Sequence, residues 1–234
     1  MHDTLARTLR SLTGPHLADG CLRCGVPIRT ASAALRPLVP GMECRGSARP
    51  VRHSGSIDVF LEVLEQVRPG DVLVVDNGGR TDEACIGDIV LLEAQAAGVA
   101  GIVIWGLLRD ATELRAIGFP VFSLGALPTG PRRLDARPAD AFTRAMVGQH
   151  AITAEDVVVA DANGVLFLPR DGLEHVVSAA ASYRDTEARQ LQAMHEGRSY
   201  REQSRFAEYL EKRRRDPEYG FRQHLKAIAA AGEV

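Results

Sequence analysis

Short apolar runs bounded by turn residues recur through the middle of the chain. They lie at Val72–Asp76, Gly101–Trp105 and 120–124, and they are rich in β-branched or aromatic residues. Runs of this length and composition predict buried β-strands. Residues 88–97 and 107–116 lie between them and predict helices, the second of which starts as a loop. Strands that alternate with helices are typical of an α/β fold.

The remaining segments are less regular. Residues up to Gly25 predict helix, a proline-marked irregular stretch follows, and residues 57–67 again show the helical period. Two apolar runs, 157–160 and 165–168, are separated by Asp-Ala-Asn-Gly, which predicts a β-hairpin because Asn and Gly tolerate positive φ. The chain from residue 173 onward predicts mainly helix, and its basic run at residues 212–215 is interpreted as a solvated helix face.

Composition narrows the class of protein. The chain has 234 residues, of which 45% are hydrophobic and 25% charged, close to the globular average. A formal net charge of −2 lacks the basic excess of a strong nucleic-acid binder, so we expect no nucleic-acid partner. No run reaches the ~18 apolar residues of a membrane span. The polar start, interrupted by Arg7 and Arg10, does not resemble a signal peptide. We therefore expect a soluble cytoplasmic protein with no membrane partner.

The four cysteines are too few for a disulfide scaffold and predict reduced thiols. Cys21 and Cys24 form a Cys-x-x-Cys motif, but a structural zinc site needs a second ligand pair, and Cys44 and Cys85 are single and far apart. Because residues three apart share a helix face, we interpret the motif as packing.

The first candidate loop ends in Gly87-Asp88 and opens a helix. Asp88 is a suitable N-cap residue, and the amides of Ile89 and Val90 then lie in the first turn without intrahelical partners. Free amides and the positive end of the helix dipole favour a bound carboxylate or phosphate. On this segment alone, an ordinary capped helix is the favoured interpretation, because Asp is a common capping residue.

The second candidate loop runs from Gly106 to Asp110, directly after a predicted strand. The guanidinium of Arg109 can hold an oxyanion in a fixed fork. The carboxylate of Asp110 can bind a divalent cation such as Mg²⁺, which often keeps several waters and takes one or two protein carboxylates. A surface ion pair is the alternative. A shared site requires the two loops to converge.

Other residues are weaker candidates for a catalytic or binding role. Asp76 closes a strand, Asp161 shapes a hairpin, and His53 lies in a Gly/Ser-rich loop without an evident partner. The sequence contains no Gly-x-Ser-x-Gly, no His-Glu-x-x-His and no P-loop, and Gly78-Gly79 lacks the spacing of a dinucleotide fingerprint.

At these loops the sequence resembles the RraA-like family, which includes 4-hydroxy-4-methyl-2-oxoglutarate aldolases and oxaloacetate decarboxylases. The likeness spans residues 12–197, and its specificity lies in the order and spacing of the matching pieces. These pieces are Arg68-Pro-Gly-Asp-Val-Leu-Val-Val-Asp76, Ala84-Cys-Ile-Gly-Asp88, residues 96–110, Gly118-Phe-Pro-Val-Phe122 and residues 155–170. Residues 132–150 match poorly, and the tail after Tyr200 extends beyond the family's usual end.

The resemblance implies a role for each loop residue. Asp110 would ligate Mg²⁺ or Mn²⁺, and Arg109 would hold the keto oxygen of a pyruvoyl substrate. The amides of Ile89 and Val90 would take its carboxylate, and Asp88 would orient a water for proton transfer. The reaction would cleave or decarboxylate a 2-oxo acid through a pyruvate enolate, stabilised electrostatically where charge develops. Neither loop contains a lysine, so a Schiff-base route is not supported.

The resemblance also implies the architecture. We expect an α-β-β-α sandwich of the RraA-like, phosphohistidine-swivelling kind over residues 1–199, with a helical C-terminal extension over residues 200–234. The family assembles as homotrimers or homohexamers, and its aldolases take a glutamate from the neighbouring subunit. Glu187, on a predicted helix, is the candidate for that residue.

Two further functions stay open. Some members of the family bind and regulate an RNA-degrading enzyme without catalysis, and a pure binder would need neither Arg109-Asp110 nor Gly87-Asp88. A different 2-oxo or sugar-acid substrate on the same metal site is the third possibility. We reject the menaquinone-pathway methyltransferase label that the family often carries, because no glycine-rich S-adenosylmethionine loop follows a strand.

Overall fold

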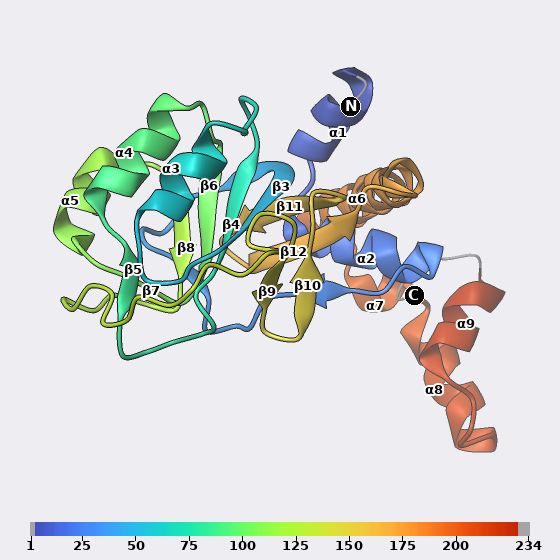
Figure 1. Cartoon of the computed structure of the whole chain (residues 1–234). Helices are drawn as coiled ribbons and strands as arrows, with labels where there is room; N and C mark the ends of the chain where they lie inside the picture. The colour runs from blue at the N-terminus through green and yellow to red at the C-terminus, as the bar shows by residue number, and fades with distance from the viewer. Residues whose placement is uncertain (1–2, 229–234) are drawn as a thin grey trace. The chain divides into compact units, whose positions relative to one another are not determined.

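The computed structural model describes residues 3–228 (Figure 1). Its contacts divide the chain into two compact units. One unit comprises residues 28–173, and the other comprises the first 27 residues together with those from Glu174 onward. The predicted division into residues 1–199 and 200–234 stays a prediction.

An eight-stranded mixed sheet forms the centre of the 28–173 unit, in the order β1-β12-β11-β3-β4-β6-β8-β2. β3, β4, β6 and β8 run parallel to one another, so their carboxyl ends lie at one edge of the sheet. The strands of this sheet are β1 (Arg29–Thr30), β2 (Arg36–Pro37), β3 (Cys44–Arg52), β4 (Val72–Asp76), β6 (Gly101–Trp105), β8 (Val121–Ser123), β11 (Asp156–Asp161) and β12 (Gly164–Pro169).

The central strand β3 differs from the expectation of an irregular stretch. Its sequence contains Gly46, Pro50 and three arginines, so it lacks an apolar pattern. The strand changes partner along its length, because residues 44–47 pair with β11 and residues 48–52 pair with β4. Pro50 lies where β3 has one strand neighbour, the setting in which a missing N–H is tolerated. Arg49 is paired with Asp71 at 3.0 Å, which satisfies its charge near the sheet.

Helices cover one face of the sheet (Figure 1). They are α3 (Asp58–Leu64), α4 (Asp88–Ala96) and α5 (Ala111–Ile117). Their apolar side chains pack against alternate residues of β3, β4, β6 and β8. The sheet is curled, so on its other face the side chains of β3, β4, β6 and β8 pack against those of β11 and β12. The hairpin of β9 (Ala145–Val147) and β10 (His150–Ile152) also packs on this face. Every residue of β4 is therefore buried, each apolar one contributing roughly 1.5–3 kcal/mol of burial free energy.

The predicted hairpin is confirmed as β11–β12, which joins Asp161 to Gly164. Asp161 Oδ1 accepts a hydrogen bond from the Asn163 amide at 2.8 Å, so this carboxylate shapes the turn. The predicted α/β class with a helical C-terminal region is also confirmed.

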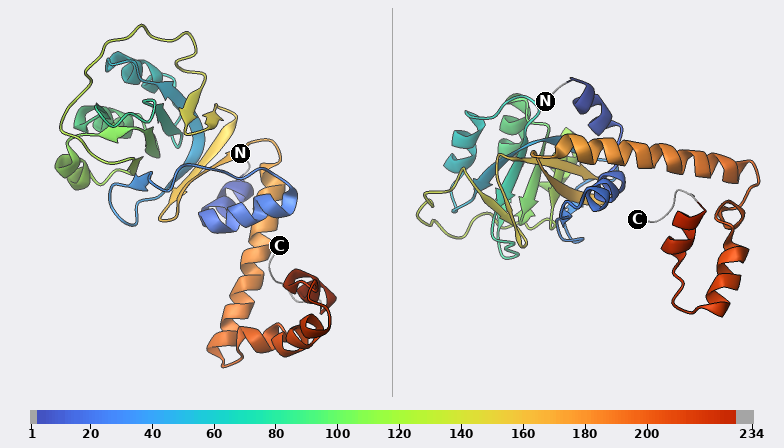
Figure 2. Two further views of the ribbon diagram at one scale, coloured as in Figure 1. Left: turned by 90° about the horizontal axis from the view of Figure 1, so that it is seen from below. Right: turned by 90° about the vertical axis from the view of Figure 1, so that its right-hand side faces the viewer.

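The second unit is helical. It contains α1 (Asp3–Arg10), α2 (Gly14–Cys24), the long α6 (Leu173–His195), α7 (Tyr200–Gln203), α8 (Phe206–Arg215) and α9 (Phe221–Ala227), and Figure 2 shows the last four in succession. α2 ends at Gly25 as predicted, with φ at 67°. An aromatic cluster of Phe206, Tyr209 and Phe221 holds α8 and α9 together. None of the helices described here combines the length and apolar character of a membrane span.

Candidate active site

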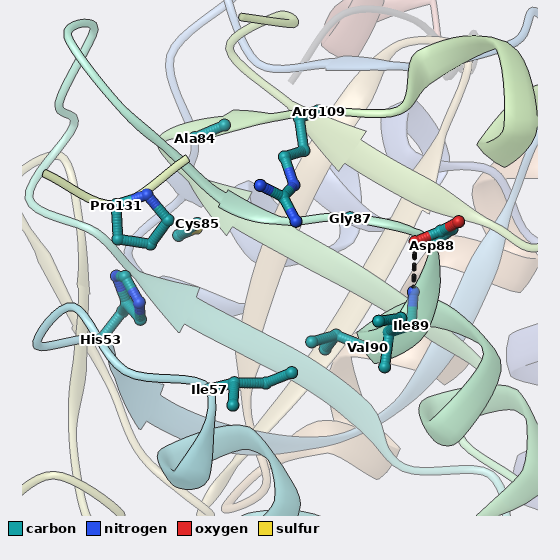
Figure 3. A pocket seen from close by; sticks show the side chains of 10 residues that line it. All are labelled: His53, Ile57, Ala84, Cys85, Gly87, Asp88, Ile89, Val90, Arg109 and Pro131. Carbon is teal, nitrogen blue, oxygen red and sulfur yellow. Dashed lines mark hydrogen bonds between the residues drawn. The ribbon is translucent and has the colours of Figure 1, made fainter. Parts of the chain in front are cut away.

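Two loops meet because two short strands pair. β5 (Ala84–Ile86) and β7 (Leu107–Leu108) run parallel, and the Arg109 amide donates to the carbonyl oxygen of Ile86 at 2.8 Å. The sequence pattern predicted neither strand, since each is only two or three residues long. Their pairing places the Gly87 loop beside Arg109 (Figure 3).

Gly87 and Asp110 are in close approach. A Cβ atom at Gly87 would lie 2.2 Å from Asp110 Oδ2 and 3.1 Å from Arg109 Nε. Asp110 Oδ2 also accepts from the Asp88 amide at 3.4 Å and lies 3.3 Å from Arg109 Nε. The two loops therefore converge, as a shared site requires.

Asp110 has an uncommon backbone conformation for a residue with a side chain. Its φ of 56° and ψ of 37° lie in the left-handed region, immediately before α5. Such a conformation costs on the order of 1–3 kcal/mol and persists where the surroundings enforce it, often at functional sites. Here it turns the Asp110 carboxylate toward the start of α4.

The start of α4 differs in one detail from the expectation. Gly87 is the N-cap residue, and Asp88 is the first helical residue. The side chain of Asp88 caps the helix locally, since its Oδ1 accepts from the Ile89 amide at 2.8 Å (Figure 3). The Ile89 amide is thus already paired with Asp88 in this structure, whereas the sequence suggested that it was open to a ligand.

A pocket of about 90 Å³ opens at this junction. Its lining combines apolar side chains with one cation, one carboxylate and one imidazole. It is formed by His53, Ile57, Ala84, Cys85, Gly87, Asp88, Ile89, Val90, Arg109 and Pro131 (Figure 3). In the view of Figure 3, His53 and Pro131 lie at one end and Asp88 at the other, with Arg109 between them. The Arg109 side chain is 45% exposed and can reach a bound anion.

His53 makes more contacts with the surrounding fold than its position in a Gly/Ser-rich loop suggested. It follows β3, and its Nδ1 lies 2.9 Å from Asn77 Oδ1 at the end of β4. Its ring stacks on Phe60 at a centroid distance of 5.3 Å. Burial lowers the pKa of His53 below its ordinary value, which favours the neutral ring. The sequence contains no local motif that would predict Asn77 as the partner of His53, because the two residues are 24 positions apart.

Pro131, in the segment 128–140, lines the pocket, and a buried carboxylate that sequence analysis missed anchors this segment. Glu83 is fully buried and accepts from Arg133 Nε at 2.9 Å and from the Arg132 amide at 3.0 Å. The Ala84 amide donates to Thr129 at 2.8 Å, and the Asp135 amide donates to Ser54 at 2.8 Å. These bonds hold Pro131 against the pocket.

The remaining candidates lie elsewhere or have structural partners. Glu187 lies on α6, in the helical unit, with its carboxylate 3.5 Å from His16 Nε2. Its predicted role across a subunit interface stays a prediction. Asp76 accepts from the amides of Gly78 at 2.8 Å and Met146 at 3.0 Å, so it stabilises the loop after β4.

The cysteines are free thiols. Cys21 is buried, and burial raises its pKa to about 11, but Cys24 is exposed, so only one half of the motif packs as expected. Cys85 lines the pocket, and burial raises its pKa well above the ordinary range, which keeps the thiol protonated.

The donor set fits a metal with few protein ligands. Within residues 3–228, no three His, Cys, Asp or Glu side chains gather as a metal cluster. Asp110 supplies a single carboxylate, and its contacts with the Asp88 amide and with Arg109 Nε both involve Oδ2. This carboxylate lies against Gly87, which lines the pocket. Mg²⁺ is commonly held by one or two carboxylates with waters completing its octahedron, so these residues fit such an ion.

Comparison with known proteins identifies the family. The RraA-like family model, described as Aldolase/RraA, matches residues 15–167. The chain belongs to the RraA-like family. Among its RraA-like relatives is a Halalkalibacterium halodurans protein named "Putative 4-hydroxy-4-methyl-2-oxoglutarate aldolase". The two are 31% identical over 161 residues, which cover 68% of this chain and 76% of that protein.

Other RraA-like relatives carry different names. Protein DlpA of Legionella pneumophila is 28% identical over 197 residues, covering 80% of this chain but 31% of that protein. The solved structure of Streptomyces coelicolor RraAS2 is described as an unusual member of the RNase ES inhibitor RraA protein family. It has a TM-score of 0.72 at 27% identity and covers 82% of this chain and 98% of that one. Names within the family thus include both an aldolase and an RNase inhibitor.

Proposed function

We propose that the protein is a divalent-metal-dependent carbon–carbon lyase that acts on a 2-oxo acid. The observation that carries the proposal is the convergence of Gly87-Asp88 with Arg109-Asp110. Gly87, Asp88 and Arg109 line one pocket, and the Asp110 carboxylate lies against Gly87. The relative named "Putative 4-hydroxy-4-methyl-2-oxoglutarate aldolase" supports the reaction class. The substrate would be a 4-hydroxy-2-oxo acid, cleaved between C3 and C4, or oxaloacetate, which would be decarboxylated.

Each loop residue has a role in this proposal. Asp110 would hold Mg²⁺ or Mn²⁺, and the bound ion would supply positive charge near the keto and carboxylate oxygens. Arg109 would donate to the keto oxygen, where negative charge develops as the electron pair of the broken bond moves onto C3. Removing one such electrostatic contact typically costs about 3–4 kcal/mol of barrier.

The start of α4 couples substrate binding to proton transfer. A substrate carboxylate that accepts hydrogen bonds from the amides of Ile89 and Val90 would displace the Asp88 side chain from the Ile89 amide. The freed Asp88 carboxylate would then orient a water that protonates C3 of the enolate. The same ligand would thereby fill the anion site and prepare the proton donor.

Assembly would complete the site. The resemblance to RraA-like proteins supports a homotrimer or homohexamer in which a neighbouring copy supplies a glutamate, and Glu187 is our candidate. Glu187→Gln, mixed with active-site variants of the same chain, would test whether subunits complement each other.

The first test is pyruvate release. Purified protein with Mg²⁺ or Mn²⁺ is offered oxaloacetate and 4-hydroxy-4-methyl-2-oxoglutarate, together with other 2-oxo and sugar acids. We expect Asp110→Ala to reduce turnover on the order of 100-fold or more, since it removes the carboxylate that holds the ion. Asp171→Ala, at an exposed position outside the pocket, is the matched control and should retain activity. Equal activity of Asp110→Ala and the parent protein would refute the metal role.

The second candidate function is binding to an RNA-degrading enzyme without catalysis. The likeness to RraAS2, from a family named for RNase ES inhibition, favours it. Inhibition of an RNase E-type ribonuclease by the protein, in the absence of pyruvate release from every 2-oxo acid tried, would support this function over the lyase.

A further inference from the structure

Among the residues described, one buried side-chain nitrogen of the pocket lining has no hydrogen-bond partner. It is Nε2 of His53, which is buried although the ring lines the pocket. The residue as a whole is only 6% exposed. A buried nitrogen without a partner costs roughly 1–3 kcal/mol, so its retention beside a pocket indicates that a ligand or a water completes it.

The surrounding network determines which kind of group Nε2 can bind. Arg133 Nη2 lies 3.1 Å from Asn77 Oδ1, and a guanidinium can only donate, so this Asn77 atom is the acceptor oxygen. His53 Nδ1 lies 2.9 Å from the same oxygen and must therefore carry its hydrogen. In the neutral ring, Nε2 is then a lone-pair acceptor. Only a donor, such as a hydroxyl group, satisfies it.

We propose that Nε2 of His53 accepts the hydrogen bond of the substrate's C4 hydroxyl and takes its proton during cleavage. This inference rests on the proposed lyase function and narrows its substrate class to 4-hydroxy-2-oxo acids. As the C3–C4 bond breaks, its electron pair stays on C3 as the enolate. The O–H pair forms the new C4 carbonyl, and the proton moves to Nε2. Protonation of C3 gives pyruvate, and the imidazolium returns its proton to solvent.

Oxaloacetate provides an internal comparison. It carries a second carboxylate in place of the hydroxyl-bearing group, and a carboxylate only accepts hydrogen bonds. His53 in the tautomer that Asn77 imposes therefore offers nothing to oxaloacetate. The two reactions share the roles proposed for Arg109 and Asp110 and differ in their use of His53.

The decisive experiment measures both reactions in one variant. His53→Phe keeps an aromatic ring against Phe60 but removes the acceptor nitrogen. With Mg²⁺, we expect kcat/KM for cleavage of 4-hydroxy-4-methyl-2-oxoglutarate to fall on the order of 100-fold, while oxaloacetate decarboxylation is nearly unchanged. His150→Phe, on β10 outside the pocket, is the matched control and should change neither reaction.

A second measurement does not depend on activity. Nitrogen-15 NMR of the histidine rings in the metal-free protein at neutral pH should show His53 as the neutral tautomer with the hydrogen on Nδ1. An Nε2–H tautomer or an imidazolium would overturn the inference, as would an equal loss of both reactions in His53→Phe. A parent protein that is inactive on both substrates would instead refute the proposed function.

Discussion

Gly87 stands where no side chain has room. Its neighbours are the carboxylate of Asp110 and the guanidinium of Arg109, which reach it from a loop more than twenty residues away in the chain. Its φ of −129° is ordinary, so the need for glycine is steric and does not come from the backbone conformation. A close approach of this kind lets the backbone of one loop contact the charged groups of the other.

The substitution Gly87→Ala tests this contact. The added Cβ would lie 2.2 Å from Asp110 Oδ2, so the carboxylate must move. We expect pyruvate-forming activity and Mg²⁺ affinity, measured by calorimetric titration, to fall at least tenfold, because misplacing one ligand typically weakens a site by that order. Gly220→Ala, where a Cβ meets nothing within 4 Å and φ is −84°, is the control. Unchanged Mg²⁺ binding in Gly87→Ala would show that Asp110 does not hold the ion.

At the scale of elements, the sequence predicted those segments whose apolar pattern is complete. β4, β6, α4 and the β11–β12 hairpin were all expected, because each buries a continuous or periodic apolar set. β3 was missed because its arginines and Pro50 conceal a central strand. β5 and β7 were missed because they are too short to show a period, although their pairing assembles the site.

The same limit applies to the candidate site. The loops at Asp88 and Arg109 were recognisable because each follows a strand or opens a helix and carries distinctive chemistry. The partnership of His53 with Asn77 and that of Glu83 with Arg133 depend on contacts between distant segments. No local pattern encodes such contacts, so sequence reasoning left these residues out or ranked them low.

The 128–140 segment is an irregular element anchored by the buried carboxylate of Glu83. Glu83→Gln keeps the shape of the side chain but removes the charge that faces Arg133, 2.9 Å away. Breaking a buried ion pair leaves a charge without compensation, so we expect a loss of unfolding free energy on the order of 3 kcal/mol in urea titrations. Limited proteolysis should then cut within residues 128–140 more rapidly.

Glu62→Gln provides the comparison for this prediction. Glu62 pairs with Arg137 of the same segment, but at an exposed position. Exposed ion pairs contribute little to stability, so this variant should behave like the parent protein. Equal effects of the two substitutions would mean that Glu83 does not anchor the segment.

The positions of tryptophan and tyrosine in the chain allow the unfolding of the two units to be followed separately by fluorescence. The single tryptophan, Trp105, lies in the 28–173 unit, at the end of β6. All four tyrosines, Tyr183, Tyr200, Tyr209 and Tyr219, lie in the helical unit. Tryptophan and tyrosine emission therefore follow the unfolding of different units in the same sample.

Metal binding should stabilise one unit through mass action. An ion that binds only the folded state adds RT ln(1 + [L]/Kd) to its stability, about 2.7 kcal/mol at a concentration of 100 Kd. If Asp110 holds Mg²⁺, the ion raises the midpoint of the Trp105 transition, and EDTA reverses the shift. The tyrosine transition should move less, because the proposed ligand lies outside that unit. Asp110→Ala should abolish the tryptophan shift while Asp171→Ala retains it. An equal shift in Asp110→Ala would place the bound ion elsewhere in the molecule and separate metal binding from the loops that meet at Gly87.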